Sequence, residues 1–201
     1  MNIIEQNYKW NGSLSKRLST KYIILHHRAG NGDVQSIHQT HLANGWSGIG
    51  YHFYVRKDGT VYRGRPLEMV GAHCKEQNQN YQSVGICFEG NYSTEKTMPD
   101  KQLQAGKELV LYLKAIYINA EIKKHSDFMA TACPGQYFPF DEIKAGKAKK
   151  ELTSANDIIW ELMHGKLKVE ISDVDRAVDE LDKARRVDGS LYWILRKIVN
   201  K

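Results

Sequence analysis

The chain has 201 residues, of which 41% are hydrophobic and 26% are charged. This composition is typical of a folded globular protein. It excludes a disordered chain. It also excludes an integral membrane protein, because no run approaches the roughly 20 apolar residues that a membrane-spanning helix needs. The formal net charge of +6 favours an anionic partner such as a cell-wall polymer. Nucleic acid would also suit the charge, but no recognition motif for it is present, so we expect none to bind.

Alternating and helical hydrophobic patterns predict a mixture of strands and helices. Residues 21–27 form a short apolar, β-branched run that ends in two histidines, and residues 83–90 form a second strand-like run. Between them, residues 48–64 show strand alternation on both sides of an Asp-Gly turn, which predicts a hairpin. Residues 33–46 and 100–118 carry apolar side chains at helical spacing. We therefore expect the α/β class, with a mixed β-sheet flanked by helices.

Within the predicted hairpin, alternation assigns side chains to two faces of the sheet. Tyr51, Phe53 and Val55 are expected on one face, and His52 and Tyr54 on the other.

Composition changes near residue 145, which suggests a second unit. Residues 146–152 are small and basic and predict a linker, and residues 153–201 contain short helical patterns typical of a small all-helical module. The main domain is then 1–145, with its core in 20–145. Our hypothesis for the module is cell-wall targeting, with a helical dimerisation unit as the alternative. The aromatic residues that lie among its basic side chains are Trp160, Tyr192 and Trp193.

The beginning of the chain and its cysteines bear on location. Residues 1–20 have no basic segment followed by an apolar run, so we expect no secretory signal and synthesis in the cytoplasm. The three cysteines are an odd number, which argues against a disulfide framework. We expect Cys74 and Cys87 to be free thiols, although Cys74 lies close enough to His73 to be near a functional cleft.

The segment 125–135, HSDFMATACPG, holds a histidine and a cysteine eight positions apart. A catalytic zinc site uses three protein ligands, commonly His and Cys, and keeps a fourth position open. His125 and Cys133 cannot share a helix face, because eight residues place them roughly 80° apart and about 12 Å along the axis. A loop that folds back would bring both to one ion. The third ligand must come from a distant segment, and the end of the strand at 21–27 is the obvious donor.

Four motifs occur in order: YIILHHRAG, GIGYHFYVRKDGTVYRGR, VGAHCKEQNQNYQSVGICFEGN and HSDFMATACPG. Together they resemble the zinc-dependent N-acetylmuramoyl-L-alanine amidases of the bacteriophage-lysozyme type, which share their fold with the peptidoglycan recognition proteins. The resemblance covers about residues 20–145. It implies the amidase or peptidoglycan-recognition-protein-like fold for this part of the chain.

The resemblance implies one Zn²⁺ per chain, held by His26, His125 and Cys133. His27 is the rival of His26, since the two are adjacent. The family places its ligand directly after the apolar strand run, which favours His26. Strand alternation would then turn His27 to the opposite face of the sheet.

Other roles also follow from the resemblance. Tyr51, in GYHF, matches the catalytic tyrosine, and we expect its hydroxyl to stabilise the oxyanion. Thr131 matches an assisting position two residues before the ligand cysteine, where phage lysozymes carry a lysine. His73, in GAH, matches a substrate-contacting histidine of the family, and Asn80 and Arg65 are secondary candidates for contacting the muramyl peptide. The proton source for the leaving amine stays open between Tyr51, His73 and water.

The three remaining histidines of the predicted elements are His38, His41 and His52. His38 and His41 lie three positions apart on a predicted helix, a spacing that suits a metal, but no third ligand accompanies them. We interpret all three as packing or surface residues.

The implied function is zinc-dependent hydrolysis of the amide bond between N-acetylmuramic acid and L-alanine in bacterial peptidoglycan. This activity would lyse the cell, as the endolysin of a phage or prophage of a Gram-positive host does. The protein would then act on the wall after release from the cytoplasm. A non-catalytic peptidoglycan-binding module is the alternative, and the presence of Tyr51 and all three ligand residues argues against it.

Overall fold

The computed structural model of the protein describes residues 2–146. All of the predicted helical module, 153–201, and the predicted linker beyond Gly146 lie outside the described residues. None of the helices within residues 2–146 is long and apolar enough to cross a membrane.

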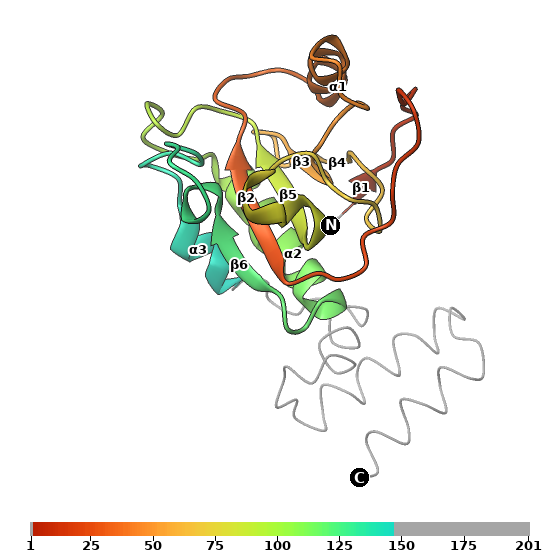
Figure 1. The fold of residues 1–201 in the computed structure, drawn as a ribbon. Helices are drawn as coiled ribbons and strands as arrows, with labels where there is room; N and C mark the ends of the chain where they lie inside the picture. Colours follow the sequence, from red (N-terminus) through yellow and green to blue (C-terminus); the bar gives the residue numbers. More distant parts are fainter. Residues whose placement is uncertain (1, 147–201) are drawn as a thin grey trace, which may run out of the picture. The chain divides into compact units, whose positions relative to one another are not determined.

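A six-stranded mixed sheet forms the centre of the described domain, in the order β1-β4-β3-β5-β2-β6 (Figure 1). Strand β2 pairs in parallel with β5 on one side and with β6 on the other, whereas β3 and β4 form the predicted antiparallel hairpin. The mixed α/β class is therefore confirmed. The strands are β1 (Ile3–Ile4), β2 (Tyr22–His27), β3 (Phe53–Val55), β4 (Val61–Arg63), β5 (Ser83–Phe88) and β6 (Glu121–Lys124).

Helices cover both faces of this sheet. On one face Leu109 of α2 packs in a buried cluster with Leu25 of β2 and Phe53 of β3, and Figure 1 shows α2 behind the central strands. On the other face Val34 and Ile37 of α1 pack in a second cluster. The helices are α1 (Val34–Ala43), α2 (Asp100–Ile116), α3 (Phe140–Ala145) and the short 3₁₀ segments η1 (Glu76–Tyr81) and η2 (His125–Asp127).

The predicted side assignment of Tyr51 in the hairpin is wrong. Phe53 and Val55 belong to the cluster under α2, as expected, but Tyr51 packs with Tyr54 and the α1 cluster on the opposite face. Strand β3 begins only at Phe53, and the chain bends at His52. The alternation of an extended strand therefore does not reach back to Tyr51.

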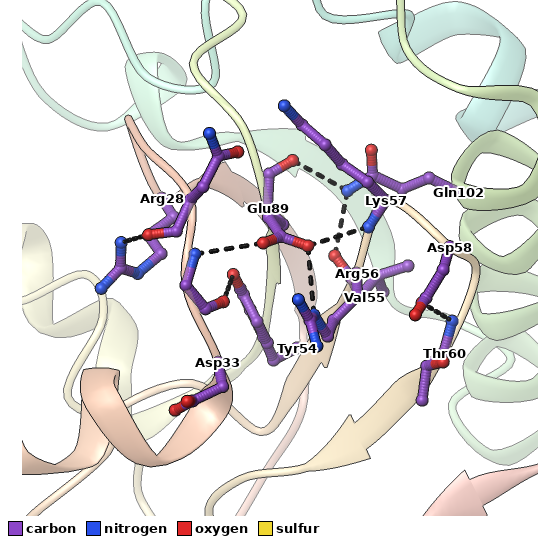
Figure 2. A network of polar contacts seen from close by, with 12 residues as sticks. Arg28, Asp33, Tyr54, Val55, Arg56, Lys57, Asp58, Thr60, Glu89 and Gln102 are labelled. Carbon is purple, nitrogen blue, oxygen red and sulfur yellow. Dashed lines mark hydrogen bonds and ion pairs between the residues drawn. The ribbon is translucent and has the colours of Figure 1, made fainter.

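A buried carboxylate fixes the loops that follow the central strands (Figure 2). Glu89, just after β5, is 5% exposed. Its carboxylate accepts hydrogen bonds from the backbone N–H of Gly32 at 3.1 Å and of Lys57 at 3.0 Å, and from Nε of Arg56 at 3.2 Å. Burial acts to raise the pKa of this carboxyl, but the two backbone N–H groups and, after them, the Arg56 guanidinium hold it below its usual value. This network ties the loop after β2 to the hairpin turn, so the carboxyl end of β2 has a defined position.

Candidate metal and active site

Strand β2 ends with two histidines that face opposite sides of the sheet. The ring of His26 lies 5.2 Å from that of Tyr51 and 4.4 Å from that of His125, measured between centroids. His27 instead accepts a hydrogen bond at Nδ1 from the backbone N–H of Tyr92, at 3.0 Å. Of the two candidates, it is therefore His26 that lies beside the other predicted ligands.

The loop 125–133 folds back on itself and brings its ends together. Strand β6 runs parallel to β2 and leads directly into η2, so His125 emerges beside His26. The backbone N–H of Ser126 donates to the carbonyl of Cys133 at 3.1 Å, which closes the loop. Cys133 Sγ lies 3.7 Å from His26 Nδ1, and the donor atoms of His26, His125 and Cys133 all lie within 4.8 Å of one another.

These three side chains fit a zinc ion. Zinc–ligand bonds of about 2.0–2.3 Å at tetrahedral angles place neighbouring donor atoms roughly 3.3–3.8 Å apart, and the Sγ–Nδ1 separation of 3.7 Å lies in that range. In addition, His125 Nε2 is buried without a hydrogen-bond partner within residues 2–146. Buried polar atoms normally have partners, so an orphaned imidazole nitrogen beside two other donors points to a cation.

Burial sets the protonation of the three donors. It lowers the pKa of His26, with further lowering by His125 and His27, and it also lowers the pKa of His125. Both imidazoles are therefore neutral at pH 7 and can offer a lone pair. Burial raises the pKa of the Cys133 thiol to about 11, so a bound cation must displace its proton.

A chain of hydrogen bonds behind His26 selects its tautomer. Ser83 Oγ lies 2.6 Å from the carbonyl of Gln79, which only accepts, so the hydroxyl donates there. His73 Nε2, 3.4 Å from Ser83 Oγ, must then be the donor to it, which leaves His73 Nδ1 as an acceptor. His26 Nε2, at 3.0 Å, donates to His73 Nδ1. His26 therefore carries its proton on Nε2, and its Nδ1 lone pair faces Cys133.

The position of His73 depends on a glycine in the neighbouring strand. A Cβ at Gly85 would lie 2.5 Å from Cγ of His73, a distance at which the two side chains would clash. Gly85 therefore leaves the space in which the His73 ring lies against β5. Neither Gly85 nor Ser83 was among our candidate site residues, because both occur inside an ordinary strand pattern.

Tyr51 is half-buried at the edge of the donor cluster. The preceding backbone is held by His41, whose Nδ1 accepts from the N–H of Gly50 at 3.0 Å. Burial raises the pKa of Tyr51 above its usual value, and the neighbouring Cys87 thiol adds to the effect. The phenol therefore keeps its proton at neutral pH and can serve as a hydrogen-bond donor.

The other predicted site residues hold backbone segments in place. Thr131 Oγ1 accepts from the N–H of Cys133 at 3.3 Å, and Asn80 Oδ1 accepts from the N–H of His73 at 2.8 Å. Arg65 is 5% exposed and donates to the carbonyl groups of Ile49 at 3.0 Å and Val70 at 2.8 Å. The expected substrate contact by Arg65 is therefore corrected, since its guanidinium is buried and occupied by backbone acceptors.

Fold and site together define an α/β protein with a candidate cation site, in which His26 ends strand β2, His125 follows the edge strand β6 and Cys133 lies in the loop beyond it. Residues 16–136 match the family model described as N-acetylmuramoyl-L-alanine amidase, and the chain belongs to this family.

Individual relatives agree with this assignment. The endolysin of Klebsiella phage KP32 is 35% identical over 150 residues, covering 71% of this chain and 95% of the relative. The amidase LysC from Clostridium intestinale URNW superimposes with a TM-score of 0.68 at 43% identity, covering 72% of this chain and 96% of LysC. Wild-type Drosophila PGRP-LB gives a TM-score of 0.63 at 26% identity, covering 75% of this chain and 98% of PGRP-LB.

The comparisons confirm several expectations from the sequence. They confirm the amidase and peptidoglycan-recognition-protein fold and the endolysin type, and they confirm amidase action on bacterial peptidoglycan as the function. The Gram-positive host stays a prediction.

Proposed function

We propose that the protein is a zinc-dependent hydrolase that cleaves the amide bond between N-acetylmuramic acid and L-alanine. The observation that carries the proposal is the convergence of His26, His125 and Cys133 donor atoms within 4.8 Å. Two neutral imidazoles and one thiolate are a donor set that zinc prefers, and three protein ligands leave a coordination position for water or substrate. When bound, zinc supplies a Lewis acid that polarises a carbonyl and lowers the pKa of water.

His73 acts as a positioning residue in this proposal. By accepting from His26 Nε2 at 3.0 Å, it keeps the Nδ1 lone pair of His26 directed at the cation position. Partners of this kind fix the ring orientation of a metal-ligating histidine, and their removal typically costs about 10–100-fold in metal affinity or activity. This role replaces the substrate contact expected for His73, which is 8% exposed and has both ring nitrogens engaged.

Tyr51 is the proposed hydrogen-bond donor to the oxyanion that develops during hydrolysis. Its ring lies beside that of His26, and its raised pKa keeps the phenolic proton available. Hydrolysis of an amide places negative charge on the former carbonyl oxygen in the transition state, and a preorganised O–H donor stabilises that charge. Thr131 contributes indirectly, because its hydroxyl fixes the backbone of Cys133.

The net charge of +6 suits anionic wall polymers as additional partners, and the proposed place of action is the wall after the protein has left the cytoplasm. Residues 153–201 are proposed to add wall affinity. Removing residues 150–201 should weaken sedimentation of the protein with purified walls, and unchanged sedimentation would end this part of the proposal.

Product analysis tests the proposed reaction directly. Purified peptidoglycan is digested with the full chain, and the fragments are identified by mass spectrometry. We expect a new amine on L-alanine, loss of the products after treatment with a chelator, and recovery after zinc is restored. Binding to peptidoglycan without any released amine would instead identify a non-catalytic recognition module.

A further inference from the structure

A second group of metal-binding side chains shares one residue with the proposed catalytic set. The donor atoms of Cys74, Glu76 and His125 lie within 4.8 Å of one another. Cys74 is 1% exposed, while Glu76 and His125 are half-buried. Thiolate, carboxylate and imidazole are the donor types of protein zinc sites. His125 belongs to both groups, and its buried Nε2 has no hydrogen-bond partner within residues 2–146.

Hydrogen bonds hold the two segments of this group together. Asn80 Oδ1 accepts from the N–H of Cys74 at 2.8 Å, and the N–H of Asn80 donates to the carbonyl of Cys74 at 2.9 Å. Within the same loop, Gln77 and Asn78 have φ values of 51° and 60°, which reverse the chain tightly. Gln77 Nε2 also donates to the carbonyl of Phe128 at 3.4 Å and so links this loop to the segment that carries His125.

The shared histidine makes the two groups mutually exclusive. A neutral imidazole offers one lone pair, because its other ring nitrogen carries the proton. A cation that binds His125 together with Cys74 and Glu76 removes it from the set that contains His26 and Cys133. We propose that Cys74, Glu76 and His125 form an alternative zinc site that competes with the catalytic site for His125.

The predicted effect of this site on activity rests on the proposed function, whereas zinc binding by Cys74, Glu76 and His125 does not depend on it. At high free zinc, mass action favours the state with more bound ions. In a state with an ion at each position only one ion can keep His125; we assign it to the alternative ion, which leaves His26 and Cys133 as the ligands of the catalytic position among residues 2–146. Excess zinc should therefore inhibit an enzyme that needs zinc.

Cobalt binding tests the alternative site without using activity. Co²⁺ stands in for zinc and gives a near-ultraviolet charge-transfer band when a thiolate binds it. We expect the full-length Cys133→Ser variant to retain a thiolate–cobalt band that comes from Cys74. The band should vanish in Cys74→Ser/Cys133→Ser and persist in the matched control Cys87→Ser/Cys133→Ser. No band in a folded Cys133→Ser protein, or a band that survives in Cys74→Ser/Cys133→Ser, would overturn the proposal.

Zinc inhibition gives a second test that keeps Cys133 intact. Activity on peptidoglycan is measured against buffered free zinc for the wild type, Glu76→Gln and the control Glu142→Gln, whose carboxylate pairs with Lys107 at 3.4 Å. We expect Glu76→Gln to need at least about tenfold more zinc for half inhibition, since loss of even a supporting partner of a ligand costs about 10–100-fold, and Glu142→Gln to match the wild type. Equal inhibition of all three proteins contradicts the alternative site. Absence of zinc-restored activity in the wild type contradicts the proposed function instead, and the cobalt result then stands alone.

Discussion

Two groups of histidines in the described residues differ in what their ring nitrogens contact. In the first group, Nδ1 accepts a backbone N–H at 3.0–3.1 Å, so each ring holds a chain segment in place. In the second group, the rings contact one another, and one nitrogen of His125 has no partner within residues 2–146. A histidine with a backbone donor on its lone pair cannot ligate a metal through that nitrogen. The first group is His27, His38, His41 and His52, and the second is His26, His73 and His125.

The comparison predicts its largest effect for the ligand cysteine. Cys133→Ser removes the thiolate that lies beside His26 and His125 of the second group, so zinc affinity should fall by more than the roughly 100-fold that loss of a supporting residue causes. Peptidoglycan hydrolysis should fall to background at limiting zinc. Metal analysis of the purified variant and product release measure the two effects. Because the proposed alternative site could still hold an ion in Cys133→Ser, the metal analysis compares Cys74→Ser with Cys74→Ser/Cys133→Ser, and full zinc retention in the double variant would show that Cys133 is not a ligand.

Tyr51→Phe separates metal binding from catalysis. The variant keeps the three donors and should bind zinc as the wild type does, but it loses the proposed oxyanion donor. We expect kcat to fall about 10²–10³-fold, the usual cost of removing one such donor. Near-normal turnover with normal zinc content would remove Tyr51 from the mechanism.

His73→Asn tests the positioning role within the second group. Without a defined acceptor for its Nε2–H, His26 loses its preferred tautomer, and zinc affinity should drop about 10–100-fold. Competition with a fluorescent chelator measures this affinity. A substrate-contact role would instead raise KM and leave zinc affinity unchanged, so the two readouts distinguish the alternatives.

Zinc affinity should rise with pH. Burial raises the pKa of the Cys133 thiol to about 11, so the metal displaces one proton throughout the neutral range. Because the lowered pKa values of His26 and His125 keep both rings neutral there, only this proton counts. The affinity should increase about tenfold per pH unit between roughly pH 7 and 9. A flat profile by the same chelator competition would argue against the thiol as ligand.

The smallest effect on zinc is expected for a histidine of the first group. His38 accepts from the N–H of Ile49 at 3.1 Å and contacts the carbonyl of Lys9 at 3.2 Å. His38→Leu leaves these backbone groups unpaired and should lower the free energy of unfolding by about 1–3 kcal/mol. Urea denaturation measures this loss. Zinc affinity should stay within about twofold of the wild type, well short of the roughly 10–100-fold cost of losing a supporting residue. A large loss of zinc affinity in this variant would contradict the distinction between the two groups of histidines.

The sequence predicted those parts of the fold that have a strong hydrophobic period. Strand β2, the hairpin and α2 were expected within a few residues of their observed bounds. Strand β6 was missed because EIKK contains one apolar residue, and its pairing with β2 is a tertiary effect that local pattern does not encode. The side of Tyr51 was wrong because a bend at His52 interrupts the alternation.

In the candidate site, too, local motifs predicted some residues, whereas tertiary packing decided the roles of others. Motifs named His26, His125, Cys133 and Tyr51, which the fold places together. The chain from His26 through His73 to Ser83 could not be predicted, because it depends on a ring lying against Gly85 of the adjacent strand. Burial of Arg65 was equally invisible, since an arginine that binds carbonyl groups has the same sequence signature as one that faces a ligand.

The separation of the proposed ligands along the chain has a consequence for assembly. His26 and Cys133 lie 107 positions apart. Strand β6, at the edge of the sheet and paired with β2 alone, leads to the second half of the ligand set. A nascent chain therefore cannot capture the ion until residue 133 has left the ribosome and this strand has docked. Once bound, the ion would link early and late segments of the domain. It would therefore slow amide exchange in β6, and the melting temperature should rise as zinc occupancy increases.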